Sequence, residues 1–197
     1  MTLDAVIDQT YPKAAYEVLA VDNGSTDDTR DVIRSYEEQY PDLVQLLVED
    51  EVQGPAAARN TGVAESEGSL LAFIDADMTV EETWLEHAIA SMESNDWDYM
   101  GCNVEIYVED GKDTLTAKYN QIFGFPIQKY IEEQQFSGTG CLFTRREVFD
   151  EVGNLTSVCS PARTRSSATG CTTPDSVSTT SPRSRCITPL ARRSRRS

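Results

Sequence analysis

A short apolar run that ends in two aspartates is the sequence feature that most restricts the fold of this chain. Residues Leu70–Ile74 are all apolar, and Asp75, Ala76 and Asp77 follow directly. An apolar run of this length between polar segments predicts a strand that is buried on both faces. Ligands of open α/β sheets bind at the carboxyl ends of such strands. Because unpaired buried acids are costly, we expect the strand to break into a turn here, with one acid placed to meet a metal ion and the other a polar group of a ligand.

Strand-like and helix-like segments alternate through the first half of the chain. We expect strands near residues 16–21, 43–48 and 70–74, and helices near residues 3–11, 27–40, 55–67 and 81–92. This alternation is the signature of an α/β fold with a doubly wound, mostly parallel sheet. The chain begins inside a helix, whereas such sheets open with a strand, so we expect the sheet to be incomplete.

Three further segments follow. Residues 99–108 and 138–143 are expected to be strands, and residues 145–152 a short helix that ends at Gly153. Residues 115–125 fit either a helix or a loop.

The charge is unevenly distributed. The whole chain carries a formal charge of −16; residues 1–153 hold nine Lys/Arg against 32 Asp/Glu, a net −23, and residues 154–197 hold eight Arg against one Asp, a net +7. The acidic part is therefore not a nucleic-acid-binding surface. Such acidity suits a protein that works at high salt, where self-repulsion is screened, although an ordinary acidic cytosolic enzyme has a similar composition.

Membrane and disulfide signals are absent from the sequence. No run of 18 apolar residues and no signal-peptide pattern occurs. We expect a cytoplasmic protein without a transmembrane segment, either free or peripheral to the cytoplasmic face of a membrane. Cys102 and Cys141 stand in apolar surroundings and are expected to be small core residues. Trp84 and Trp97 are also expected in the core, and His87 on a helix flank without a chemical role.

Four segments, taken in order, resemble family 2 glycosyltransferases of the GT-A (Rossmann-like) fold. They are residues 21–29 (VDNGSTDDT), 54–62 (GPAAARNTG), 73–77 (FIDAD) and 138–149 (GTGCLFTRREVF). Each alone is a weak signal, but their order and separations are together specific. The resemblance covers residues 1–153, which we assign to a partial glycosyltransferase domain.

The resemblance implies transfer of a sugar, with inversion, from a nucleoside-diphosphate donor to an acceptor hydroxyl on a glycan, a lipid-linked sugar or another molecule. A divalent cation, Mg²⁺ or Mn²⁺, would neutralise charge growing on the leaving diphosphate. Asp77 would ligate it, and Asp75 would contact the ribose or donor sugar or serve as a second ligand.

The same resemblance assigns the remaining donor-side residues. Asp22 would accept a hydrogen bond from the base, with Asn23 and Ser25 supporting its turn. Gly54 would allow close approach of the backbone to the nucleotide, and Arg59 would hold a diphosphate or an acid of the site. On the acceptor side stand Gly138, Thr139 and Gly140.

Each assignment has a plainer alternative. The turn at Asp22 could be only a helix cap, Gly54 could mark tight helix packing, and Arg59 could form a surface ion pair worth under about 1 kcal/mol. The functional interpretation is favoured at Asp22, Asp75 and Asp77 because three acids at strand ends should converge on one crevice.

A second enzyme class also fits the two aspartates. Residues 75–80 (DADMTV) match the nucleophile motif of haloacid-dehalogenase-like phosphatases, in which the first Asp attacks phosphorus and the second is the acid/base. That class places its motif on the first strand and needs a later strand ending in paired acids. Here two strands precede the motif, and no later strand ends in paired acids, so the phosphatase is the less favoured reading.

Residues 154–197 differ sharply from the rest. Thirty of these 44 residues are Ser, Thr, Pro or Arg, and none is Glu, Lys, Phe, Tyr, Trp or Met. Such a segment is expected to be a disordered or aberrant tail. A shifted reading frame explains the composition more specifically, since in that frame residues 160–170 permit Ala-Gly-Ala-Asp-Thr-Glu-Phe-Gly-His-Arg.

The change falls where the family continues with the acidic motif that supplies its catalytic base. Asp150 and Glu151 lie nearby but precede it, so the catalytic residue is left unassigned. We therefore expect impaired transfer, with a non-catalytic nucleotide-binding remnant as the alternative.

Overall fold

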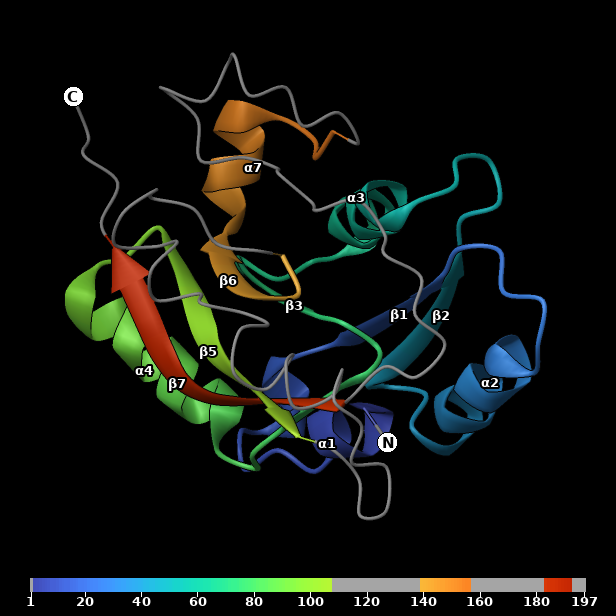
Figure 1. The fold of residues 1–197 in the computed structure, drawn as a ribbon, viewed down its shortest axis with the longest axis horizontal. Helices are drawn as coiled ribbons and strands as arrows, with labels where there is room; N and C mark the ends of the chain where they lie inside the picture. Colours follow the sequence, from blue (N-terminus) through green and yellow to red (C-terminus); the bar gives the residue numbers. More distant parts are fainter. Residues whose placement is uncertain (1, 108–138, 157–182, 193–197) are drawn as a thin grey trace, which may run out of the picture. The chain divides into compact units, whose positions relative to one another are not determined.

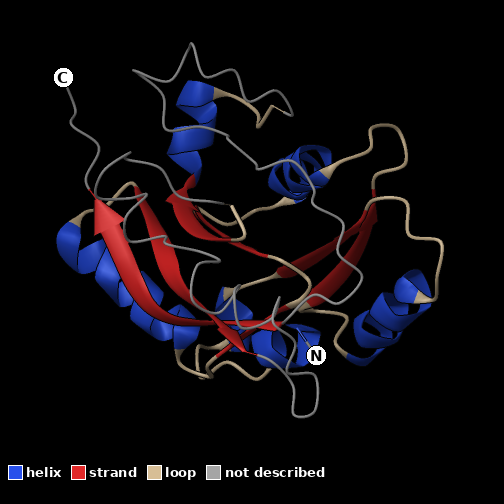
Figure 2. Ribbon diagram, in the orientation of Figure 1, coloured by secondary structure: helices blue, strands red, loops and turns tan. Residues whose placement is uncertain are grey.

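The computed structural model describes residues 2–107, 139–156 and 183–192. The chain divides into two compact units. One consists of residues 1–11, 72–144 and 174–197, and the other of residues 12–71 and 145–173. Each unit contains both helices and strands (Figures 1 and 2).

The unit that contains residues 12–71 is centred on a pair of parallel strands. Its elements, in chain order, are η1 (Lys13–Ala15), β1 (Val18–Asp22), α2 (Thr29–Gln39), β2 (Val44–Val48), α3 (Pro55–Glu65) and α7 (Arg146–Val152). β1 and β2 pair in register from Val18 with Val44 to Asp22 with Val48. The carboxyl ends of both strands therefore lie at the same edge, where the segments after Asp22 and Val48 begin.

Both long helices of this unit pack on the strand pair. α2 contacts β2 and β1, and α3 contacts β1. Ile33, Val44 and Ala56 are buried there. α3 begins where expected because Gly54 adopts a φ of 125°, open to glycine but strained for other residues, and Pro55 fits the first helical turn.

The other unit holds a mixed five-stranded sheet. Its elements are α1 (Thr2–Ile7), β3 (Leu70–Ile74), β4 (Met78–Val80), α4 (Trp84–Asn95), β5 (Tyr99–Tyr107), β6 (Cys141–Arg145) and β7 (Arg183–Arg192), with β3 and β6 reaching the boundary of the unit. The strand order is β3-β6-β5-β7-β4. β5 runs antiparallel to β6 and β7, whereas β4 runs parallel to β7. The sheet is therefore less parallel than the sequence predicted.

Apolar side chains of α4, β5 and β6 form the core of this unit. Met92, Met100 and Phe143 are fully buried. The rings of Trp84 and Phe143 lie 4.7 Å apart at a tilt of 55°, a favourable aromatic arrangement. Cys102 and Cys141 are buried, as the sequence predicted.

Strand β7 corrects the expectation of a disordered tail for residues 183–192. This segment pairs with β5 from Arg183 opposite Tyr107 to Arg192 opposite Tyr99, with one irregularity after Asn103. Strand pairing uses backbone N–H and C=O groups, and every residue except proline has both. A Ser/Thr/Arg-rich composition therefore does not prevent pairing. The rest of the tail, the segment 115–125 and Gly138 lie outside the described residues.

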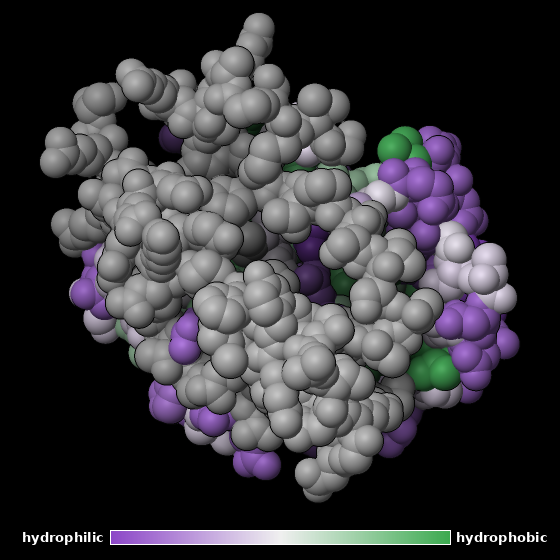
Figure 3. All heavy atoms as spheres, in the orientation of Figure 1, coloured by the Kyte–Doolittle hydropathy of each residue, from purple (hydrophilic) through white to green (hydrophobic). Residues whose placement is uncertain are grey.

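The surface agrees with the acidic composition. On the face drawn in Figure 3, the visible described surface is mostly hydrophilic, with small hydrophobic patches. Val48 and Val52 are exposed large apolar residues. None of the helices in the described part of the chain is long and apolar enough to cross a membrane.

Candidate functional site

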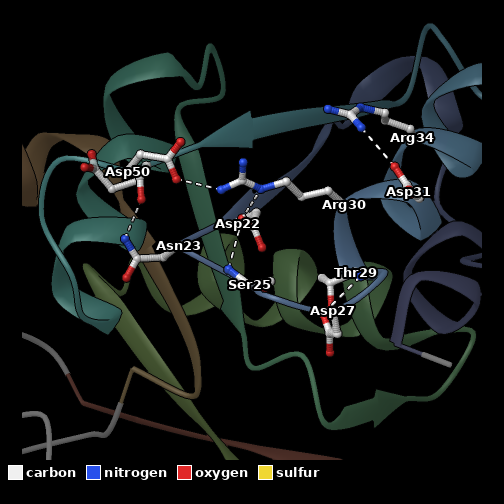
Figure 4. A network of polar contacts seen from close by, with 10 residues as sticks. Asp22, Asn23, Ser25, Asp27, Thr29, Arg30, Asp31, Arg34 and Asp50 are labelled. Carbon is white, nitrogen blue, oxygen red and sulfur yellow. Dashed lines mark hydrogen bonds and ion pairs between the residues drawn. The ribbon is translucent and has the colours of Figure 1, made fainter.

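The carboxyl end of β1 places one aspartate in a closed environment. The side chain of Asp22 is 0% exposed, and its Oδ2 accepts hydrogen bonds from Arg30 Nε at 2.6 Å and from the backbone N–H of Ser25 at 3.3 Å. Arg30 Nη2 donates in turn to Asp50 Oδ1 at 2.6 Å (Figure 4). The other oxygen, Asp22 Oδ1, is buried without a hydrogen-bond partner in the structure.

Opposing effects act on the pKa of Asp22. Burial raises it, while the hydrogen bonds from Ser25 and Arg30 and the charge of Arg30 lower it, and the pKa ends below its ordinary value. The ionised form is thus favoured although the side chain is buried. An ionised carboxylate only accepts hydrogen bonds, so Oδ1 is suited to an N–H donor.

Asn23 fastens the segment after β2 to the turn after β1. Its Nδ2 donates to the carbonyl oxygens of Glu49 and Val52, each at 2.8 Å, and its Oδ1 accepts from the N–H of Gly54 at 2.7 Å. Both N–H donors of the amide, and its oxygen, are thus engaged within the protein. Asn23 and Gly54 therefore hold the two loops together, which agrees with the supporting role expected for Asn23.

Glu49 organises the same segment from its other side. Its carboxylate accepts from the N–H groups of Glu51 and Val52 and from the hydroxyl of Thr61 in α3. The bond from the Val52 N–H, followed by that from Thr61, lowers the pKa of Glu49. This residue was not singled out in the sequence, because its partners come from a loop and a helix whose contact no local pattern predicts.

The helix α2 begins later than expected. Thr29 is its first residue, and Asp28 at the N-cap makes no side-chain capping bond. Asp27 Oδ1 instead accepts from the N–H and the hydroxyl of Thr29 at 3.1 and 2.6 Å. Ser25 therefore contributes its backbone N–H to Asp22 and is not the helix cap.

In the other unit, Asp75, Ala76 and Asp77 form a tight turn between β3 and β4. The carbonyl of Asp75 accepts from the N–H of Met78 at 3.1 Å, which closes a four-residue turn. Asp75 is half-buried, and Ala76 and Asp77 are exposed. The expectation that the strand breaks into a turn at the two carboxylates is confirmed.

Two distant segments fix this turn. The hydroxyl of Thr2 in α1 lies 2.5 Å from the carbonyl of Ala76 and 2.7 Å from that of Met78. The N–H of Asp75 donates to the carbonyl of Gly140 at 3.0 Å. A Cβ added to Gly140 would lie 2.6 Å from Asp75 Oδ2, so only glycine fits beside the carboxylate in its present position. Thr139, the next acceptor-side candidate, is buried.

The donor atoms of this turn fit a divalent cation. Mg²⁺ and Mn²⁺ prefer carboxylate oxygens, and Mg²⁺ usually takes one or two protein carboxylates together with phosphates of the substrate. Asp75 and Asp77 supply two such groups. Among the residues that the structure describes, no group of three or more His, Cys, Asp or Glu side chains is placed to hold a metal ion.

The structure distributes the predicted residues over its two units. Asp22, Asn23, Ser25, Gly54 and Arg59 belong to one unit, and Asp75, Ala76, Asp77, Thr139 and Gly140 to the other. Arg59 is half-buried on α3. The convergence of Asp22 with the two later acids on one crevice stays a prediction.

One more arginine has a structural role that the sequence did not indicate. Arg146, at the start of α7, donates from its guanidinium to the carbonyl oxygens of Val63, Ser66 and Gly68 at 2.6–3.2 Å. These carbonyls lie at the end of α3 and just beyond it, where a cation is favoured by the helix dipole.

Comparison with known proteins defines the class. The family model described as glycosyl transferase family 2 matches residues 1–153. The chain is 40% identical over 151 residues to glycosyltransferase AglE of Haloferax volcanii, an alignment that covers 77% of the chain and 49% of that protein. It is 30% identical over 176 residues to an uncharacterized glycosyltransferase of Nostoc sp., covering 86% of the chain and 52% of the relative. The chain thus belongs to glycosyltransferase family 2 and spans about half the length of these relatives.

Solved structures show the same fold. A mannosyltransferase from Pyrobaculum calidifontis, in complex with GDP-Man and Mn²⁺, has a TM-score of 0.57 at 24% identity and is matched over 79% of this chain and 42% of its own. TarS of S. aureus in complex with UDP-GlcNAc has a TM-score of 0.52 at 21% identity, over 76% of this chain and 42% of its own. The predicted GT-A fold is confirmed, and membership of this family disfavours the phosphatase alternative.

Proposed function

We propose that this chain carries the donor half of an enzyme that transfers a sugar, with inversion, from a nucleoside-diphosphate sugar to an acceptor hydroxyl. The observation that carries the proposal is the turn after β3. It presents two aspartates at the carboxyl end of the apolar edge strand β3 and is fixed by Thr2 and Gly140. The GDP-Man and UDP-GlcNAc bound by the two structural neighbours agree with a nucleotide-sugar donor.

The roles of the donor-side residues follow from their surroundings. Asp77 is exposed and would ligate Mg²⁺ or Mn²⁺, while half-buried Asp75 would contact the ribose or donor sugar or act as the second ligand. The cation, when bound, neutralises charge that develops on the leaving diphosphate. The Mn²⁺ in the mannosyltransferase complex supports this choice of cation. Arg59 would add a positive charge for the diphosphate.

In the turn after β1, buried Asp22 would accept a hydrogen bond from the nucleobase through Oδ1. The Asn23 side chain and Gly54 would hold the neighbouring loop in place. The acceptor would be a glycan, a lipid-linked sugar or another hydroxyl compound met near Thr139 and Gly140. A cytoplasmic location, free or at the membrane's cytoplasmic face, is part of the same proposal.

We further propose that residues 154–197 are translated out of frame and that transfer by this chain is weak. Asp150 and Glu151 are exposed on α7 and are the last acids before the composition changes. The expected base motif is absent from the sequence that follows. The donor site would then bind nucleotide with little turnover.

A comparison of two proteins tests the function. One protein has the present sequence, and in the other the residues after 153 are translated in the restored reading frame. Both are assayed for Mn²⁺-dependent release of nucleoside diphosphate from UDP- and GDP-sugars, with and without sugar acceptors. We expect nucleotide binding by both and efficient transfer only by the restored version. Equal activity of the two would refute the impairment, and no nucleotide binding by either folded protein would refute the function.

A further inference from the structure

The two oxygens of Asp22 have unequal surroundings. Oδ2 accepts from Arg30 Nε and the Ser25 N–H, while Oδ1 is buried and has no hydrogen-bond partner. Leaving a buried acceptor unpaired is unfavourable, and more so when it is charged. Native structures seldom keep such an atom without a reason, and a functional role of the group is one such reason.

Arg30 is held from two directions. Its Nε meets Asp22 at the end of β1 and its Nη2 meets Asp50 just beyond β2, both at 2.6 Å, and its side chain is 30% exposed. Figure 4 shows the guanidinium between the two carboxylates. The planar fork of arginine lets one side chain orient both acids, which a lysine would not do. Asp50 is 61% exposed, so solvent screens its charge, and its main effect is to orient the guanidinium of Arg30.

We propose that Arg30 is a positioning residue that selects the nucleobase: it keeps Asp22 an acceptor-only group with Oδ1 turned to the base, so that bases with a ring N–H are bound and bases with a ring acceptor are rejected. This inference rests on the proposed function, because it requires that Asp22 meets a base. Uracil and guanine have the ring N–H, whereas cytosine and adenine present an unprotonated ring nitrogen at the corresponding edge.

The selection follows from protonation. Without Arg30, only the hydrogen bonds from Ser25 oppose burial, and the balance shifts toward the neutral carboxyl group. A neutral carboxyl has an O–H that donates to a ring nitrogen, and it then accepts less strongly from a ring N–H. Removing Arg30 should therefore weaken binding of UDP and GDP while sparing or improving binding of CDP and ADP. A purely structural role would weaken all four nucleotides by a similar factor.

Calorimetric titration of the full chain with UDP, GDP, CDP and ADP in the presence of Mn²⁺ tests the inference. We expect the protein to prefer UDP or GDP over CDP and ADP by about tenfold or more, the effect of one charge-assisted hydrogen bond. In Arg30→Met this preference should fall to about threefold or less. Arg34→Met is the matched control, since Arg34 lies one turn along the same helix and pairs only with exposed Asp31 among the ion pairs described.

The outcomes separate the inference from the function beneath it. If the folded protein binds none of the four nucleotides, the proposed function fails. If it binds them without preference, or if Arg30→Met keeps the preference or weakens all four equally, the inference alone is wrong. Should Arg30→Met not melt cooperatively, Arg30→Gln replaces it. Glutamine keeps a polar N–H group but removes the charge, so an unchanged preference in that variant also overturns the inference.

Discussion

Replacing Gly140 with alanine should separate metal-dependent binding from fold stability. The added Cβ would lie 2.6 Å from Asp75 Oδ2, and ordinary contact begins at 3.4 Å, so one of the two atoms must move by at least 0.8 Å. The Gly140 backbone is held by its bond to the Asp75 N–H. The carboxylate, at the end of a rotatable side chain, is therefore the group that moves.

Gly140→Ala should affect folding stability and metal binding to different extents. Rotation of Asp75 away from its preferred geometry costs about 0.5–1.5 kcal/mol of folding free energy. Metal ligands tolerate displacements of only about 0.2 Å, and loss of a supporting contact weakens metal affinity about 10–100-fold. We therefore expect Gly140→Ala to weaken Mn²⁺-dependent nucleotide binding by that factor while the melting temperature changes little.

Titration calorimetry of Mn²⁺ with the nucleotide, alongside thermal melts, measures both quantities. Gly62→Ala is the control, because its Cβ would lie at an ordinary 3.5 Å from the nearest atom, a methyl of Val21. It should leave binding unchanged and slightly stabilise α3. If Gly140→Ala binds Mn²⁺ and nucleotide as tightly as the unaltered protein, the placement of Asp75 at the cation site is wrong.

Further tests address the other features. Asn23→Ala removes three hydrogen bonds of 2.7–2.8 Å and should lower the free energy of unfolding in urea by about 2 kcal/mol, and a loss under about 0.5 kcal/mol would contradict the fastening role. The pKa of Asp22 is lowered in the folded protein, so the ionised side chain stabilises the fold above about pH 4, and this stabilisation is lost as the pH falls through the folded-state pKa. Urea unfolding should therefore give a lower free energy of unfolding at pH 3 than at pH 5. Equal values at the two pH values would count against the ion pair. With a net charge of −16, the melting temperature should rise between about 0.1 M and 2 M KCl as repulsion is screened, and a fall would exclude adaptation to high salt.

The sequence predicted those parts of the fold that depend on local patterns. The apolar run Leu70–Ile74, the helix start at Gly54-Pro55 and the helix end at Gly153 all appear where they were expected. The position of each is decided by a few neighbouring residues, through an apolar run or a special backbone angle. The expectation that the strand is buried on both faces is wrong, because within β3 only Leu71 is buried and Ala72 is exposed. The turn at Asp75–Asp77 belongs to the same class, because two acids one residue apart favour the end of an apolar strand.

Contacts between distant segments could not be predicted in this way. Arg30 and Asp50 are 20 residues apart, and Thr2 meets Ala76 across 74 residues. Many arginines and acids in this chain could have paired, and only the packing of α2 on β1 and β2 selects these. The sequence analysis did not predict the strand β7 for a related reason. Its expectation for this segment came from the side-chain composition, whereas strand pairing is made by backbone groups.

Mn²⁺-dependent binding of a nucleoside diphosphate, compared between the unaltered chain and Asp77→Asn, tests the central claim most directly. Asparagine keeps the size of the side chain and removes its charge, so folding should be preserved, and circular dichroism verifies this. We predict that UDP or GDP binds in the presence of Mn²⁺, that EDTA weakens binding, and that Asp77→Asn loses the dependence on Mn²⁺. Binding that is equally tight in Asp77→Asn and unaffected by EDTA would contradict a donor site built on this turn.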